Sequence, residues 1–250
     1  MEDAKLQRRF LELAERAHAT GRYTYTNFLN LMELDAFSRM EKSLRAIPFT
    51  LFGGADGCER KLIRFGDASS CAYEEEMPIA CLKIEPRNSK FSDPLTHRDF
   101  LGSIMSLGVE RETIGDIFVM DNTAHVFALK HIAPYILSEL VSIRRTAVIC
   151  AIVENMPVTA GAKKESEQIQ LVSERLDAVV AHAYKLSRND SLALFKSGKI
   201  FVNDRLVENS SYPVKPQDAV SVRGYGKFLY GGVVGTTRKG KLLARIEKYV

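Results

Sequence analysis

The sequence predicts an α+β protein in three parts, at residues 1–76, 77–154 and 169–250, with an exposed linker at 155–168. The first part mixes helix and strand patterns. The middle part follows the order strand, helix, strand, strand, helix, strand, which is the order of a ferredoxin-like sheet. The last part shows two short amphipathic helices and then short strands. The linker has mixed charges and no apolar period.

Composition and charge are typical of a soluble globular protein. The 250 residues are 46% hydrophobic and 26% charged, and the net charge is +4. This charge is uneven, because residues 171–250 carry 14 Lys and Arg against 7 Asp and Glu. A positive C-terminal part favours an anionic partner such as a nucleic acid.

No segment predicts export or membrane insertion. The first five residues, MEDAK, lack the apolar core of a signal peptide, and the longest aliphatic run, at 147–153, is too short to cross a bilayer. The four cysteines show no C-x-x-C spacing, which is typical of free thiols in a reducing cytoplasm. We therefore expect a cytoplasmic protein with no membrane partner.

The first part predicts helices at 3–19 and 31–44 and a strand at 61–65. Its glycine-rich run at 53–57, GGADG, invites comparison with phosphate-binding loops. Neither G-x-x-x-x-G-K-[ST] nor G-x-G-x-x-G is present, so a glycine turn between two strands is the better interpretation.

The middle part contains two local signals that support its element order. Thr96 with Asp99 makes a capping box, and Asp121-Asn122 is a hairpin turn between two apolar runs. The predicted elements are strands at 79–84, 117–120, 124–129 and 147–153 and helices that start at Thr96 and Pro134.

RNA-recognition motifs share this order and stack bases on aromatic side chains of their middle strands. Only Phe118 and Phe127 are candidates for stacking here, and the run 123–127 lacks the expected basic-Gly-aromatic pattern. We therefore interpret the middle part as an RNA-recognition-like scaffold or a ribosome-docking platform.

The last part begins with two predicted helices. Ser173 is a candidate N-cap of the first, and Asp177 suits the positive end of its dipole. Ser187 with Asp190 predicts a capping box for the second helix, which Gly198 ends. Strands at 200–202, 205–207 and 220–222 follow. The glycine-rich basic segment 231–241 fits either a segment that orders on RNA or a turn-rich tail.

Basic side chains in this part fall outside the apolar pattern. They lie at the ends of the two helices and in the strands that follow. Two helix N-termini with free N–H groups beside these cations predict a phosphate-binding surface. An isolated run of charges would more simply be a solvated face.

The pattern as a whole decides between these interpretations. The segments R-L-D, L-S-R, S-G-K-I-F-V-N, V-K-P-x-D and V-S-V-R, in this order, closely resemble the S4 domain, named after the fourth small-subunit ribosomal protein. That family binds structured RNA through its two helices and the following loop. Gln217 departs from the family, which usually has Gly at this turn position. The RNA-binding residues that the resemblance implies are Arg175, Lys185, Ser187, Arg188, Asn189, Lys196, Lys199, Asn203 and Arg205. We also predict Arg223 and Lys227 as RNA-binding residues.

The whole chain resembles the bacterial YlmH family. The resemblance is carried by GGADxxERK at 53–61, LTHRDFLG at 95–102, IGDI at 114–117, RLDAV at 175–179 and RGYGKF at 223–228. It implies a ribosome-associated protein with rRNA and tRNA as partners, bound at the large subunit and acting in rescue or quality control of stalled particles that carry peptidyl-tRNA. A ribosome assembly factor is the alternative.

An RNA-modifying enzyme is a further alternative. Pseudouridine synthases combine an S4 domain with a catalytic Arg-Leu-Asp motif, and Arg175-Leu176-Asp177 matches these letters. Those enzymes place the catalytic domain after the S4 domain, and only the glycine-rich segment follows here. The five histidines show no metal-ligand spacing. We therefore predict no catalytic residue, no metal, no cofactor and no small-molecule substrate.

Overall fold

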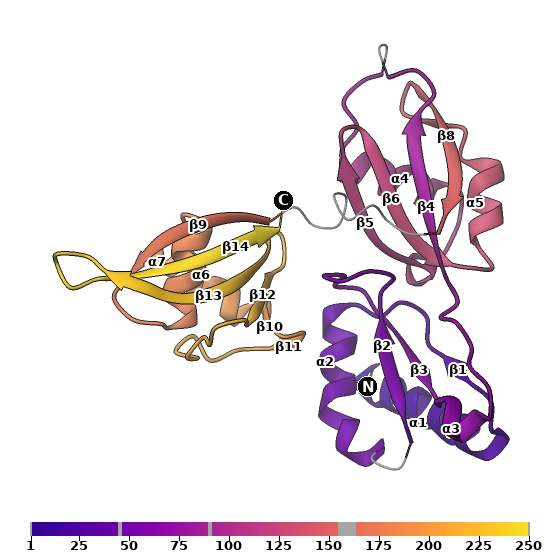
Figure 1. The fold of residues 1–250 in the computed structure, drawn as a ribbon, viewed down its shortest axis with the longest axis horizontal. Helices are drawn as coiled ribbons and strands as arrows, with labels where there is room; N and C mark the ends of the chain where they lie inside the picture. The colour runs from indigo at the N-terminus through magenta and orange to yellow at the C-terminus, as the bar shows by residue number, and fades with distance from the viewer. Residues whose placement is uncertain (1, 45–46, 90–91, 155–163, 250) are drawn as a thin grey trace. The chain divides into compact units, whose positions relative to one another are not determined.

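A computed structural model gives the structure of the protein and describes residues 2–44, 47–89, 92–154 and 164–249. The chain forms two compact units, Met1–Gly161 and Ala162–Val250 (Figure 1). Helices and strands are mixed in both units, which confirms the α+β class. Within the described ranges, no helix is long and apolar enough to span a membrane.

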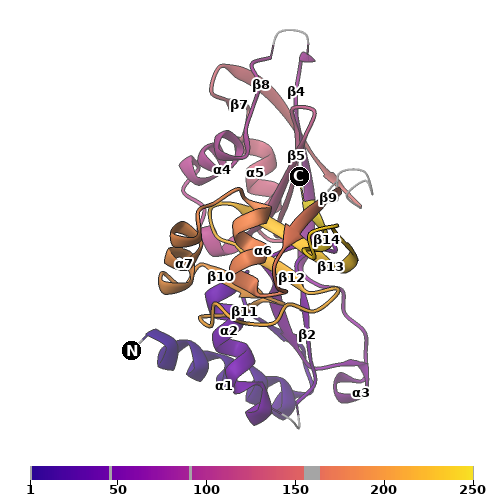
Figure 2. The same cartoon turned by 90° about the vertical axis from the view of Figure 1, so that its left-hand side faces the viewer.

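The first unit begins with a small antiparallel sheet in the order β1-β3-β2. Helices α1 and α2 pack against each other (Figure 2), with the rings of Phe10 and Phe37 in edge contact at 5.3 Å in a core that includes Phe65 of the sheet. The elements are α1 (Glu2–Thr20), β1 (Thr24–Tyr25), α2 (Leu31–Met40), the 3₁₀ turn η1 (Glu41–Leu44), β2 (Phe49–Phe52), β3 (Leu62–Phe65) and α3 (Ala68–Cys71).

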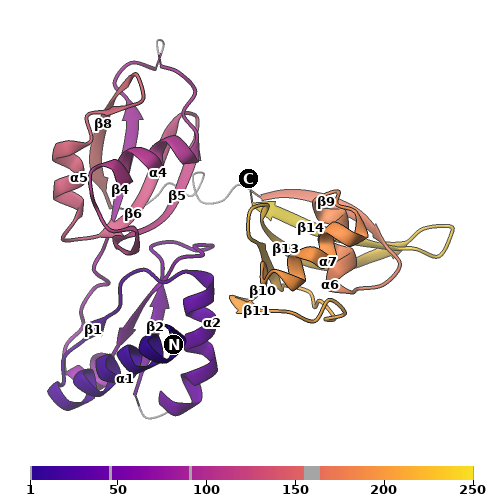
Figure 3. The ribbon, with the colours of Figure 1, turned by 180° about the vertical axis from the view of Figure 1, so that it is seen from behind.

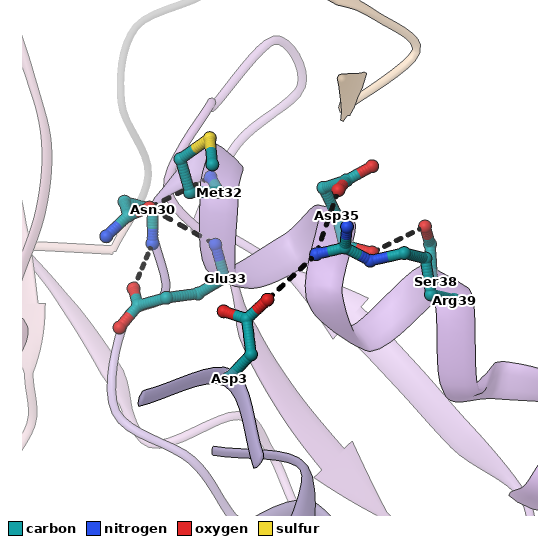
Figure 4. A network of polar contacts seen from close by, with 7 residues as sticks. All are labelled: Asp3, Asn30, Met32, Glu33, Asp35, Ser38 and Arg39. Carbon is teal, nitrogen blue, oxygen red and sulfur yellow. Dashed lines mark hydrogen bonds and ion pairs between the residues drawn. The ribbon is translucent and has the colours of Figure 1, made fainter. Parts of the chain in front are cut away.

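Polar contacts fix the start of α2 and its position against α1. The side chain of Asn30 accepts the N–H groups of Met32 and Glu33, and the Glu33 carboxylate accepts the N–H of Asn30 at 2.7 Å (Figure 4). This reciprocal capping box satisfies N–H groups that lack a partner at a helix start. Farther along α2, Arg39 pairs with Asp3 of α1 at 3.3 Å.

The second part of this unit is a five-stranded antiparallel sheet in the order β5-β6-β4-β8-β7. Its four long strands have the order 2-3-1-4 of a ferredoxin-like sheet, and α4 and α5 cover one face (Figure 3). The elements are β4 (Ile79–Pro86), α4 (His97–Ser106), the 3₁₀ turn η3 (Arg111–Thr113), β5 (Ile114–Met120), β6 (Thr123–Leu129), α5 (Ala133–Glu139), β7 (Ser142–Ile143) and β8 (Thr146–Val153).

The local signals in this part are confirmed. Thr96 and Asp99 form the capping box of α4. Asp121 and Asn122 take the positive φ angles of a tight hairpin turn, +47° and +64°. Asn122 also holds the chain that enters α4, because its side chain accepts the N–H of Leu95 at 2.5 Å.

The two sheets of the first unit share an apolar core. Phe28 and Leu62 from the N-terminal part pack with Cys81 and Phe127 from the middle part. Gly54 lies so close to Phe127 that a Cβ atom on it would be 2.2 Å from the ring. The glycine-rich run 53–57 follows β2, as predicted, but it also forms part of the contact between the two sheets.

Hydrogen bonds reinforce this contact at two of the YlmH-like motifs. The carboxylate of Asp116 accepts the N–H groups of Glu59 and Arg60. The guanidinium of Arg60 donates to the carbonyls of Ile114 and Phe28 at 3.0 and 2.9 Å. The motifs at 53–61 and 114–117 therefore serve to join the two parts into one unit.

The second unit is a six-stranded sheet in the order β11-β10-β12-β13-β14-β9, with α6 and α7 on one face (Figures 1 and 3). Its elements are β9 (Lys164–Leu171), α6 (Leu176–Ala183), α7 (Arg188–Lys196), β10 (Ile200–Val202), β11 (Arg205–Leu206), β12 (Ala219–Val222), β13 (Gly226–Thr236) and β14 (Leu242–Tyr249).

This unit is larger than predicted, which requires two corrections. Strand β9 starts at Lys164 and pairs with β14 along its whole length, so residues 164–168 belong to the sheet and not to a linker. The segment 231–241 is neither a turn-rich tail nor unstructured, because most of it continues β13 into a long hairpin with β14. The rest of the predicted linker, 155–163, lies outside the described residues.

Candidate RNA-binding surface

The start of α6 uses its polar groups internally. Arg175, not Ser173, is the N-cap residue, and its guanidinium binds the buried carboxylate of Asp177 through two bonds of 3.0 Å. The N–H groups of Leu176 and Asp177 donate to the backbone carbonyls of residues 212 and 210. The prediction of free N–H groups at this helix start was therefore wrong, and Arg175 is committed to Asp177.

The start of α7 presents exposed side chains. Ser187 is the N-cap residue, and its hydroxyl accepts the N–H of Asp190 at 3.1 Å and donates to the Asp190 carboxylate at 2.6 Å. Arg188 and Asn189 follow in the first turn, and Lys185 precedes the cap with a φ of +53°. Ser187 is thus a structural cap, whereas its basic neighbours face solvent.

A second group of basic residues lies at the C-terminal end of α7. Gly198 ends the helix with a φ of +63°, as predicted, and Lys196 and Lys199 are exposed on either side of it. The carbonyl of Lys199 accepts the N–H of Arg223 at 3.0 Å. Lys199 and Arg223 therefore lie on neighbouring segments of the backbone, although 24 positions separate them in the sequence.

Asn203 has an internal role. It forms a tight turn with Asp204, both with positive φ angles, as predicted. Its side chain donates to Asp218 at 2.8 Å and accepts the N–H of Ala219 at 3.0 Å. Asn203 therefore ties two turns together, and Arg205 remains exposed on the short strand that follows.

Free positive charge remains on this surface after these internal contacts. Five of the predicted cations form no ion pair with any residue that the structure describes, and all five are exposed. They are Lys185, Arg188, Lys196, Lys199 and Arg223. Such cations can bind phosphates without first breaking an internal ion pair.

Sequence reasoning missed an aromatic group at the β12–β13 turn. The side chain of Lys227 is half-buried, with its Nζ 5.5 Å from the ring centre of Tyr249. Tyr225 is exposed, and its ring centre lies 5.5 Å from that of Tyr184. The signal in the sequence was an aromatic residue between two glycines and two cations, in RGYGK at 223–227.

The aromatic candidates of the middle sheet are not available as a pair. Phe127 is only 2% exposed, because the N-terminal part covers it. Phe118 is half-buried and lies next to His125, which is buried without a hydrogen-bond partner for either ring nitrogen. Burial and the nearby Lys83 lower the pKa of His125. Base stacking across this sheet in the manner of an RNA-recognition motif would require Phe127 to be uncovered.

Asp177, the residue of interest for an enzyme, is 4% exposed and bound to Arg175. A carboxylate that is held in this way has a structural role, whether or not the chain carries out chemistry elsewhere. Across the residues that the structure describes, no three His, Cys, Asp or Glu side chains are grouped so that they could hold a metal ion.

Comparison with known proteins finds two RNA-binding domain families in the chain. A family model described as "Putative RNA-binding domain in YlmH" matches residues 73–158, and the S4 domain model matches residues 174–220. The chain is 27% identical over 197 residues to ribosome-associated protein quality control protein P2 of Bacillus subtilis, covering 78% of this chain and 76% of that protein. A solved structure, cell division protein ylmH from Streptococcus pneumoniae, matches with a TM-score of 0.50 and 21% identity, over 64% of this chain and 94% of the other. That structural match supports the fold.

Proposed function

We propose that the chain is a member of the YlmH family of RNA-binding proteins and that it binds structured RNA on the ribosome through its S4 domain. We further propose that the bound particle is the large subunit and that the protein acts in quality control of stalled particles that carry peptidyl-tRNA. The name of the Bacillus subtilis relative supports ribosome association and quality control. A cytoplasmic location follows from this proposal.

One observation carries the RNA-binding proposal. The exposed, unpaired cations lie on α7 and on the strand ends beside it, where the side chains are not needed for the core. Each cation that meets a phosphate releases a condensed counterion, so binding should weaken steeply as salt rises. With about four phosphates engaged, the slope of log affinity against log salt should be near −3.

We propose that the protein acts by binding and not by catalysis. The Arg-Leu-Asp motif supports this view, because its carboxylate is buried against Arg175 and would have to leave that pair to reach a substrate. Incubation with rRNA and tRNA followed by nucleoside analysis tests this part. New pseudouridine that disappears with Asp177→Asn would contradict it.

Sedimentation tests the docking surface and the particle together. The tagged protein should co-migrate with large subunits, and the double variant Arg188→Ala with Lys199→Ala should not. Loss of one charge-assisted phosphate contact costs about 1–2 kcal/mol, or roughly tenfold in affinity. Arg16→Ala, which removes an exposed cation from α1, is the matched control and should co-migrate normally.

Each outcome has a definite meaning. Unchanged co-migration and salt slope in the double variant would show that the S4 surface is not the docking face. Large subunits that carry peptidyl-tRNA in the peak would support the quality-control proposal. Migration with immature particles would instead favour an assembly factor.

A further inference from the structure

The turn between β12 and β13 presents an aromatic ring to solvent. Tyr225 is 48% exposed. Every other aromatic side chain in the described residues of the second unit is buried or half-buried. A single exposed ring is ordinary on a protein surface, so its significance depends on what holds it and what surrounds it.

The backbone holds this ring in a defined place. The N–H of Tyr225 donates to the carbonyl of Val222 at 2.9 Å, and the N–H of Arg223 donates to the carbonyl of Lys199 at 3.0 Å. Gly224 takes a φ of +90°, which is favourable for glycine alone. The turn is therefore held by backbone hydrogen bonds to the end of β12 and to the residue that precedes β10.

The ring has a support on one side. Its centre lies 5.5 Å from that of Tyr184, at an interplanar angle of 51°, and Tyr184 in turn lies 6.0 Å from Phe228 of the core. This chain of rings connects Tyr225 to the interior. A ring that is supported from behind loses little conformational freedom when a flat ligand covers its open side.

The surroundings are positively charged. Arg223 and Lys227 flank the turn. Lys248, whose Nζ lies 5.9 Å from the ring centre of Tyr184, is paired with Glu167 and adds no net charge. No Asp or Glu occurs in the sequence between Asp218 and Glu247. A flat apolar surface with cations around it is the combination that binds a nucleotide, since it offers stacking for the base and attraction for the phosphate.

We propose that Tyr225 stacks on an unpaired base of the bound RNA, while Arg223 contacts a phosphate next to that base. This proposal rests on the proposed function and adds the kind of RNA that the S4 unit would prefer, namely a loop or bulge rather than a continuous duplex. Bases within a duplex are already stacked and cannot cover the ring. If Tyr225 instead only shields Tyr184, any apolar side chain of similar size would replace it.

The absence of tryptophan from the sequence allows a direct test. The variant Tyr225→Trp introduces a single indole, whose fluorescence is quenched when a base stacks on it. The probes are a stem–loop RNA with an unpaired loop and the same stem closed as a blunt duplex. We expect quenching by the stem–loop and little by the duplex. Tyr135→Trp, at a 44% exposed position in α5, is the matched control and should show no quenching by either RNA.

Affinity measurements separate stacking from simple shielding. Tyr225→Phe keeps the ring and should bind the stem–loop like the parent protein. Tyr225→Leu keeps apolar bulk and should bind it about tenfold more weakly, the usual effect of losing one base–aromatic stack. Melting temperatures measured on the same samples should agree within a degree or two, since the side chain is half exposed.

The failure of this proposal can be distinguished from failure of the proposed function. If Tyr225→Leu binds like the parent and the indole is not quenched, while Arg188→Ala weakens binding, the stacking proposal is wrong and the S4 surface still binds RNA. If neither RNA binds and no variant changes ribosome co-migration, the proposed function itself is wrong, and the stacking proposal fails with it.

Discussion

The contact between the two sheets of the first unit can be tested at one glycine. Gly54 has a φ of +107°, and a Cβ atom there would lie 2.2 Å from Cδ1 of Phe127. The substitution Gly54→Ala therefore introduces two penalties at once. A residue with a Cβ in the left-handed region costs about 1–2 kcal/mol, and overpacking against a buried ring costs about 1–3 kcal/mol. We expect a total loss of about 2–5 kcal/mol from the free energy of unfolding of this unit.

Two other glycines separate these penalties. Gly108 also has a positive φ, +81°, but a Cβ there would meet nothing within 4 Å. Gly108→Ala should therefore cost only the backbone term, about 1–2 kcal/mol. Gly102 lies inside α4 with open space around it, so Gly102→Ala should stabilise the unit by up to about 1 kcal/mol through helix propensity.

The assay should report on the first unit by itself, because the second unit has its own core. Hydrogen exchange of the full chain in increasing urea, read from peptides that cover 114–129, provides this resolution. From the most to the least stable, the order should be Gly102→Ala, the parent protein, Gly108→Ala and Gly54→Ala. A double-mutant cycle of Gly54→Ala with Phe127→Leu should show coupling of about 1 kcal/mol or more, because the smaller side chain relieves the overlap.

The reasoning would be refuted by a simple result. If Gly54→Ala is no more destabilising than Gly108→Ala, the glycine loop does not pack on the middle sheet. Additivity in the cycle with Phe127→Leu would lead to the same conclusion.

Two further predictions follow from backbone strain and from burial. Gln217 has a φ of +74°, and its N–H donates to the carbonyl of Tyr230. Because glycine adopts this φ without strain, Gln217→Gly should stabilise the second unit by about 0.5–1 kcal/mol, measured by thermal unfolding of the full chain. An unchanged or lower melting temperature would contradict this. The pKa of His125 is lowered by burial, so the folded protein holds it neutral while the unfolded chain takes up a proton near pH 6.5. The free energy of folding that comes from burying neutral His125 is therefore present above that pH and is lost as the pH falls below it. The stability of the first unit should drop more between pH 7 and 5 in the parent than in His125→Leu. Equal losses in the two proteins would show that His125 does not titrate differently on folding.

Local signals in the sequence were sufficient for much of the fold. The capping box of Thr96 and Asp99, the turn at Asp121 and Asn122 and the helix end at Gly198 each depend on a few neighbouring residues, and all three are confirmed. The same holds for the turn at Gln217, which takes a positive φ of +74° that favours glycine.

Contacts between distant residues account for what the sequence did not predict. Strand β13 contains glycines, which weaken strand propensity, and it has register irregularities next to Gly232 and Gly235. It is a strand because β12 and β14 pair with it, and pairing partners are not visible in a local pattern. In the same way, the local pattern does not show that the guanidinium of Arg175 binds the carboxylate of Asp177 in the folded chain.

The shared core of the first unit limits how the gene can be divided. A protein made of the middle sheet alone would expose Phe127 and Leu129 to water. The carboxylate of Asp116 would also lose the hydrogen bonds that it accepts from the backbone N–H groups of the N-terminal part. Recombination or engineering could therefore transplant the second unit as a module, whereas the two sheets of the first unit would have to be inherited together. The motifs at 53–61 and 114–117 contact each other through Arg60 and Asp116, so each of the two sheets depends on the other for these hydrogen bonds.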